Sequence, residues 1–107
     1  MSIVNMNKDM FDKAVVEEGK LVLVDYWAPW CVYCRRIAPA LDKVAGQYGE
    51  QLMIAKVNID EEGSLAQQEK IEVIPTMVMY QDGKAVDSIV APDSKAKIEE
   101  FIKKYVR

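Results

Sequence analysis

The sequence predicts an α/β domain built on a mixed β-sheet. Strand and helix patterns alternate from the start of the chain to about residue 70, an order typical of parallel strands joined by crossover helices. An Asp-Gly pair at residues 82–83 then predicts an antiparallel hairpin. The chain has 107 residues, of which 50% are hydrophobic, so we expect one domain, residues 1–107, with its own core.

Hydrophobic periodicity places the first elements. Residues 3–6 can form a short strand, and Asn7 is suited to cap the helix that follows, which we expect to end at Gly19. Residues 21–27 are apolar almost without interruption, which predicts a central strand buried on both faces. The apolar face of the first helix consists of Met10, Phe11, Ala14 and Val15.

A longer helix is predicted from Cys31 to the glycines at 46 and 49. Pro39 lies inside it and removes one backbone hydrogen bond. We therefore expect a kink about one turn earlier, which sets the cysteine-bearing turn at an angle to the rest of the helix. The apolar stripe of this helix is Ile37, Leu41, Val44 and Tyr48.

The second half of the chain predicts a strand over residues 52–59 and a short helix over 64–70. The hairpin strands then span 76–80 and 84–90. A final helix is expected to cover one sheet face with Ile98, Phe101, Ile102 and Tyr105.

Composition and charge exclude several classes of partner. The net charge of −3 and the pI near 5.0 give no electrostatic footprint for nucleic acid. The apolar runs are shorter than a membrane span, so no membrane partner is expected. Residues 1–5 lack a basic region followed by an apolar stretch, which predicts a cytoplasmic protein. An exported protein given without its signal would have the same sequence.

Cys31 and Cys34 are the two cysteines of the chain, and they lie where a strand passes into a helix. Helix positions three residues apart share a face, so this pair can form a disulfide. The positive end of the helix dipole and the free N–H groups there favour a thiolate on Cys31, and Arg35 and Arg36 can add positive potential or form a solvated face. The pattern therefore favours dithiol redox chemistry.

Other interpretations of the cysteine pair carry less weight. A structural zinc site needs four ligands, and the chain has no histidine and no third cysteine, so two chains would have to share the metal. A purely structural disulfide would close too small a ring to stabilise the fold strongly. Two buried, inert thiols remain an alternative.

With these features the sequence resembles the thioredoxin family over essentially its whole length. The resemblance implies the thioredoxin fold, a three-layer α/β/α sandwich with a central mixed sheet. It also implies a cis peptide bond before Pro75. The matching segments are Val24-Asp25-Tyr26-Trp27-Ala28-Pro29-Trp30-Cys31, Pro39, Lys56-Val57-Asn58-Ile59-Asp60, Ile74-Pro75-Thr76 and Asp82-Gly83.

The resemblance assigns catalytic roles that the residue chemistry supports. Cys31 would attack a disulfide as a thiolate, and Cys34 would resolve the mixed disulfide. Cys34 needs a base, and the candidate is Asp25, whose burial should raise the pKa of its carboxyl. The alternative is that Asp25 only caps the strand end. Lys56 would approach Asp25, as its counterpart does in the family, or be a solvated lysine at a strand end.

The family's substrate groove maps onto Trp30, Ile74, Pro75 and Ala91, with the backbone of Ile74 offered to an extended substrate. Two departures fall at this site: Val32-Tyr33 stands where the family usually has Gly-Pro, and Ala91-Pro92 stands where it usually has a glycine. We expect the N–H of Tyr33 to point at the Cys31 sulfur and to raise the reduction potential modestly. Trp27, Met77 and Met79 are interpreted as packing residues.

The resemblance thus implies a protein dithiol–disulfide oxidoreductase that works as a reductase, with its own Cys31–Cys34 disulfide as the redox group and with no metal or added cofactor. A flavoprotein thioredoxin reductase would supply electrons, protein disulfides would be the substrates, and the protein would be a monomer. Alternatives are a disulfide oxidase or isomerase with the same dithiol, or a redox-silent binding module that uses the groove around Trp30 and Pro75.

Overall fold

The computed structural model describes residues 3–106 and contains a five-stranded mixed sheet with the strand order β1-β3-β2-β4-β5. β1, β3 and β2 run parallel to one another. β4 pairs antiparallel with β2 on one side and with the edge strand β5 on the other. The elements in chain order are β1 (Val4–Asn5), α1 (Lys8–Val15), β2 (Leu21–Trp27), α2 (Val32–Tyr48), β3 (Met53–Asn58), α3 (Gly63–Gln68), β4 (Thr76–Gln81), β5 (Lys84–Val90) and α4 (Lys95–Lys103).

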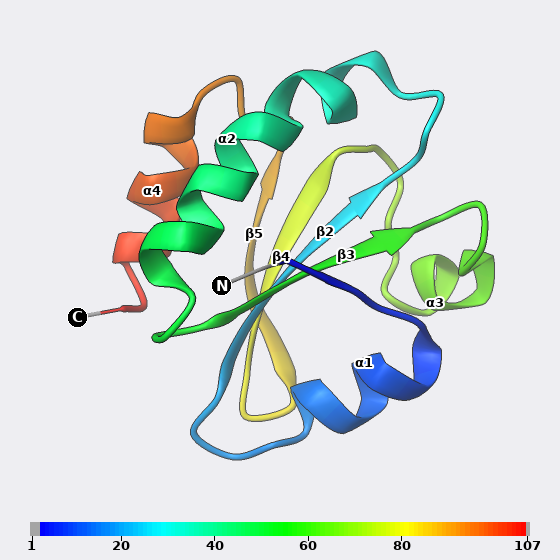
Figure 1. Ribbon diagram of the computed structural model, residues 1–107. Coiled ribbons are helices and arrows are strands. Elements are labelled where there is room, and N and C mark those ends of the chain that lie inside the picture. Colours follow the sequence, from blue (N-terminus) through cyan, green and yellow to red (C-terminus); the bar gives the residue numbers. More distant parts are fainter. Residues whose placement is uncertain (1–2, 107) are drawn as a thin grey trace.

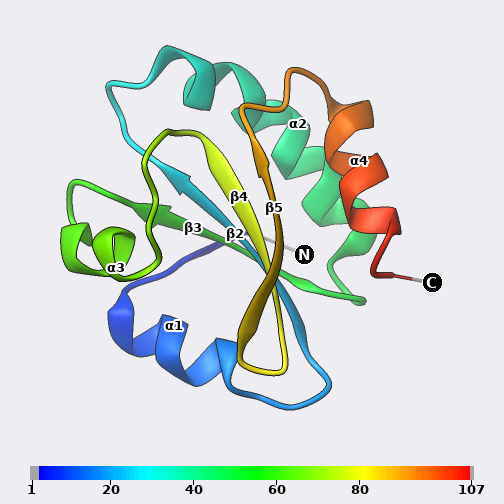
Figure 2. The same ribbon diagram turned by 180° about the vertical axis from the view of Figure 1, so that it is seen from behind.

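Helices cover both faces of the sheet, with α2 and α4 on one face and α1 and α3 on the other (Figures 1 and 2). Alternation along β2 explains the two cores. Leu23 packs with apolar residues of α2 and α4, whereas Val22 and Val24 pack with residues of α1 and α3. The predicted three-layer α/β/α sandwich with a mixed sheet is confirmed, and β2 is its central strand.

The hairpin between β4 and β5 turns at Asp82 and Gly83, with φ angles of 52° and 84°. Two successive residues in the left-handed region define the type of turn that matches the twist of a two-stranded ribbon, and Asp-Gly tolerates it well. The predicted hairpin is confirmed. Asp82 also accepts the backbone N–H of Gly19 at 2.7 Å, which ties the hairpin to the loop before β2.

Three local expectations differ from the structure. α1 ends at Val15, four residues before Gly19, and Met10 is 39% exposed because the buried residues of this helix are Phe11 and Val15, one turn apart. Gly46 lies inside α2, which ends at Tyr48 and is followed by Gly49.

Pro39 lies inside α2, as predicted, and its missing N–H leaves the Arg35 carbonyl without its helical partner. The kink itself stays a prediction. Within residues 3–106, no helix is long and apolar enough to cross a membrane.

Candidate active site

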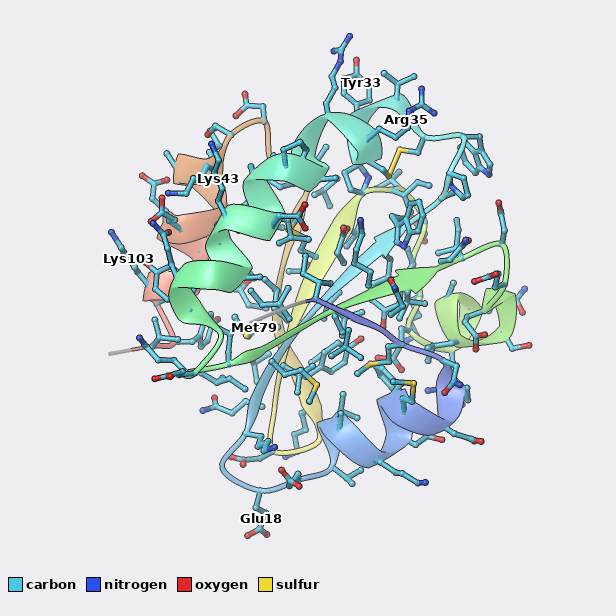
Figure 3. The ribbon with its side chains drawn as sticks, viewed as in Figure 1. Glu18, Tyr33, Arg35, Lys43, Met79 and Lys103 are labelled. Atoms are coloured by element: carbon cyan, nitrogen blue, oxygen red, sulfur yellow. A yellow bond between two sulfur atoms is a disulfide. The ribbon has the colours of Figure 1, made fainter. Side chains whose placement is uncertain are left out.

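The cysteine turn connects the end of β2 to the start of α2. Cys31 is the N-cap of α2, with extended backbone, and its Sγ accepts the backbone N–H of Cys34 at 3.2 Å. The two cysteines form a disulfide, with their Cα atoms 5.2 Å apart. Figure 3 shows this disulfide as a yellow bond at the start of α2, close to Tyr33 and Arg35. The prediction that Tyr33 supplies the N–H was wrong: the donor is Cys34, one residue further along, which occupies the third helical position.

The sulfur atoms are protected while their neighbours are exposed. Cys31 and Cys34 are 7% and 3% exposed and pack with Ala28. In contrast, Trp30 is 64% exposed and Tyr33 is 65% exposed. A reacting disulfide must therefore come close to the protein surface to reach Cys31, and it meets these two aromatic side chains as it does so.

The loop before β4 forms the opposite side of the cysteine turn. The Ile74–Pro75 peptide bond is cis, and the carbonyl oxygen of Ile74 lies 3.9 Å from Cys31 Sγ. The backbone N–H of Ala91 donates to the carbonyl of Pro75 at 2.8 Å. The structure thus brings Cys31, Ile74, Pro75 and Ala91 together, an arrangement that the resemblance to the family implied.

Ala91 occupies an unusual backbone conformation for a residue with a side chain. Its φ angle is 44°, in the left-handed region that glycine adopts without strain. The residue that the family usually places here is glycine, and this conformation explains that preference. In this chain the methyl group of Ala91 adds to the surface next to Pro75 and Pro92.

Asp25 is the buried carboxylate of the site. It is 1% exposed, and neither carboxylate oxygen has a hydrogen-bond partner within residues 3–106. Burial raises the pKa of its carboxyl from 3.8 to about 7, although the charge of Lys56 lowers it. Asp25 alternates with Leu23 along β2, so it faces the α2 side of the sheet, on which the cysteines lie. It is an interior residue of β2, not a cap at its end.

Lys56 lies beside Asp25 on the neighbouring strand. The two residues are register partners in the parallel β2–β3 pair, so their side chains share a face. The Nζ of Lys56 lies 4.6 Å from the centroid of the Trp27 ring, in a cation–π contact. Lys56 is half-buried and is therefore not simply a solvated lysine at a strand end.

Two polar contacts that the sequence analysis did not identify hold the loop before Cys31. The indole Nε1 of Trp30 donates to both carboxylate oxygens of Asp60, at 3.2 and 3.1 Å. The Arg35 guanidinium donates to the carbonyl of Pro29 at 2.8 Å. Asp60 follows β3 and ends the segment of residues 56–60 that matches the thioredoxin family. This match was the signal by which the sequence could have identified Asp60 as a site residue. Within residues 3–106, no group of three or more His, Cys, Asp or Glu side chains is placed to hold a metal ion.

A disulfide at the start of a helix, beside a cis-proline loop and on the same sheet face as a buried carboxylate, defines a thiol–disulfide oxidoreductase. The sequence profile of the Thioredoxin family matches residues 2–104. The chain belongs to the thioredoxin family.

Individual relatives agree with this assignment. The chain is 42% identical to Thioredoxin 1 of Synechococcus elongatus, over 90% of each chain. It is 41% identical to the chloroplastic M-type thioredoxin of Chlamydomonas reinhardtii, over 94% of this chain and 72% of that protein.

A solved structure is also similar. The thioredoxin of Malassezia sympodialis (Mala s 13) superposes with a TM-score of 0.88 at 29% identity, covering 98% of this chain and 90% of that one. The chain is therefore a protein dithiol–disulfide oxidoreductase, and its redox group is its own disulfide.

Proposed function

We propose that this protein is a thioredoxin-type reductase in which Cys31 is the nucleophile and Cys34 is the resolving thiol. The observation that carries the proposal is the environment of the Cys31 sulfur, which caps α2 and accepts the N–H of Cys34. A hydrogen bond and the positive end of a helix both stabilise a thiolate, and the thiolate is the reactive form. The preceding residue in the chain, Trp30, is exposed where a substrate would approach.

The reaction proceeds in two exchange steps. The Cys31 thiolate attacks one sulfur of the substrate disulfide, that S–S bond breaks, and the other substrate sulfur leaves as a thiolate. Cys34 then loses its proton and attacks the Cys31 sulfur, which forms the Cys31–Cys34 disulfide and releases the second substrate thiolate. Two electrons pass from the protein to the substrate.

Asp25 is the proposed base for the second step. A carboxyl with a pKa of about 7 can accept a proton at neutral pH and return it, because its two forms are of similar stability there. The carboxylate oxygens make no hydrogen bond within the described residues, so no fixed donor competes for them. Lys56 acts through Asp25 by keeping the pKa of this carboxyl from rising further.

The partners follow from the reaction. The thioredoxin family is generally reduced by thioredoxin reductase and acts on protein disulfides. For this chain we propose a flavoprotein reductase as the electron donor, extended segments of substrate proteins docked along Ile74 and Pro75, a monomeric state and a cytoplasmic location. The exposed side chains of Trp30 and of Val73, which lies just before the cis-proline bond, support docking of a polypeptide.

The test compares single cysteine variants in the reduction of an accessible protein disulfide. Cys31→Ser is expected to abolish the reaction, whereas Cys34→Ser is expected to accumulate mixed disulfides that gel electrophoresis and mass spectrometry detect. Ser64→Ala, in the short helix α3, is the control and should keep the parent rate. A Cys34→Ser variant that turns over as fast as the parent would disprove the two-thiol mechanism.

A further inference from the structure

A hollow of about 250 Å³ lies between the first turns of α2 and the segment that connects β5 to α4. Its lining residues are Tyr33, Arg36, Ile37, Ala91, Pro92 and Asp93. It adjoins the active site on two sides, because Tyr33 directly precedes Cys34 and the N–H of Ala91 donates to the Pro75 carbonyl. A substrate held at the cis-proline loop would therefore pass its mouth.

The hollow has an apolar floor and an aromatic wall. Ile37 and Pro92 are buried beneath it, whereas Tyr33 and Arg36 are exposed. The guanidinium carbon of Arg36 lies 5.6 Å from the centroid of the Tyr33 ring, in a cation–π contact one helical turn away. Figure 3 shows Tyr33 projecting from the start of α2. The contact favours this position of the ring before any partner arrives, which lowers the entropy lost on binding.

We propose that this hollow is a subsite for one apolar side chain of the substrate polypeptide, carried by a residue close to the reacting cysteine. The proposal rests on the proposed reductase function and names the substrate feature that the site selects. The volume is below the range of about 300–1,000 Å³ that is typical of small-molecule sites, which favours a single side chain over a free ligand. The hollow is continuous with the cysteine turn and the cis-proline loop. Its occupant therefore belongs to the substrate polypeptide whose disulfide reacts with Cys31.

Three of the four residues that depart from the family pattern line the hollow, and Val32 is the exception. Tyr33 provides an aromatic ring where the usual proline has a smaller aliphatic ring, and Ala91-Pro92 provides a methyl group and a pyrrolidine ring where a glycine is usual. Each replacement adds apolar surface around the same hollow. Arg36 and Asp93 place one positive and one negative charge at its edge, where both side chains stay exposed. The departures thus act together on substrate choice.

The test uses short peptides that each contain one cysteine joined by a disulfide to a nitrothiobenzoate chromophore. The background is glycine and serine, and a single leucine is placed in turn at each position near the cysteine. Attack by the Cys31 thiolate on the peptide sulfur breaks the disulfide and releases the coloured thiolate. Cys34 then releases the peptide thiol. The protein is reduced beforehand and freed of reductant, so that kcat/KM is measured over the single turnover that oxidises Cys31 and Cys34. The measured quantity is the ratio of kcat/KM with leucine to kcat/KM with glycine at each position.

We expect leucine at one position to raise kcat/KM about tenfold in the parent, the lower end of discrimination by an apolar pocket. Arg36→Ala and Tyr33→Ala should each bring this ratio close to one, since each removes part of the wall. Lys43→Ala, an exposed cation further along α2 (Figure 3), should keep the parent ratio. Each rate is normalised to that with dithiobis(nitrobenzoate), a disulfide without a peptide chain, which corrects for altered thiol reactivity.

A parent that reduces dithiobis(nitrobenzoate) but shows no leucine preference overturns the subsite and leaves the reductase function standing. An equal preference in the parent, Arg36→Ala and Tyr33→Ala also overturns it, because the leucine then binds elsewhere. A parent that reduces neither the peptides nor the small disulfide overturns the proposed function and the subsite with it.

Discussion

Lys56 lies directly beside Asp25 across the parallel β2–β3 pair, and its positive charge opposes the effect of burial on the pKa of that carboxyl. Burial dominates, because the pKa is raised from 3.8 to about 7. The sheet register therefore places a group that can exchange a proton at neutral pH on the face that carries the redox-active cysteines.

Asp25→Asn should stabilise the protein at neutral pH. The folded protein holds the Asp25 proton up to a pKa of about 7, whereas the unfolded chain releases it near 3.8. The parent therefore loses stability as the pH rises from 4 to 7, by roughly 4 kcal/mol for this group, and asparagine removes that loss. Urea unfolding of the oxidised proteins between pH 4 and pH 8 measures the difference.

Asp42→Asn, at an exposed position of α2, is the matched control and should follow the parent. The free energies of unfolding of Asp25→Asn and the parent should converge near pH 4 and separate above it. Parallel profiles over the whole range would show that Asp25 has an ordinary pKa.

The same substitution should slow the second exchange step. Without a carboxylate, Cys34 loses its assisting base. At pH values below about 8, the rate at which the mixed disulfide is resolved should therefore decrease, while the rate of attack by Cys31 changes less. Stopped-flow measurement of the two steps separates them. An unchanged resolution rate between pH 6 and pH 8 would remove Asp25 from the mechanism.

Lys56→Gln should move the pH dependence of that step upward. Lys56 lowers the pKa of Asp25, so its removal raises this pKa above 7 and delays formation of the carboxylate. The pH midpoint of the resolution rate is the quantity to compare, with Lys43→Gln on the exposed face of α2 as the control. A midpoint that moves downward, or one that moves equally in both variants, contradicts the pairing of Lys56 with Asp25.

Ala91→Gly should stabilise the fold, although glycine usually destabilises. An L-residue in the left-handed region costs about 1–2 kcal/mol, and Ala91 has a φ of 44°. The greater freedom of glycine in the unfolded chain offsets about 0.4–1 kcal/mol of this, which leaves a net gain. Ala96→Gly, at an exposed position in the first turn of α4, should lose stability by up to about 1 kcal/mol. Equal losses in both variants, by thermal unfolding, would mean that Ala91 carries no strain.

Tyr80→Phe should destabilise the core on the α1–α3 side. The Tyr80 hydroxyl lies 2.7 Å from that of Tyr26 and donates to Glu69 at 2.8 Å. Its removal leaves a buried hydroxyl and a carboxylate without this partner, at a cost of about 1–3 kcal/mol. Tyr48→Phe in the last turn of α2 is the control. A loss no larger than that of the control, by urea unfolding, would show that this hydrogen-bonded chain adds no stability.

Local sequence was sufficient to predict the cysteine turn. A strand followed by Cys31 at a helix start determines the N-cap geometry, and that geometry depends on a few neighbouring residues. The spacing of apolar residues could not resolve the edge of a helical face, so Met10 was assigned to the buried side although it is 39% exposed. The donor to Cys31 was misplaced by one residue because both N–H groups lie in the same turn.

Contacts between distant segments could not be predicted without the sheet register. Tyr26 meets Tyr80 because β2 and β4 pair antiparallel at the centre of the sheet, and Glu69 reaches them from the end of α3. The hollow beside Tyr33 forms where α2 approaches the turn before α4. Such contacts depend on how the layers pack, and no local pattern specifies them.

The reduction potential of the Cys31/Cys34 pair tests the reductase function most directly. Equilibration with glutathione, read by mass spectrometry after acid quenching, gives the value. Thioredoxin itself has a reference value of about −270 mV. Because the N–H donor to Cys31 is that of Cys34 and not an added one from Tyr33, we expect a potential close to that value and below about −220 mV. Such a value makes the protein a reductant toward the disulfides of a reducing compartment. A potential at or above about −180 mV, as in protein disulfide isomerase, would contradict the reductase function and favour an oxidase or isomerase.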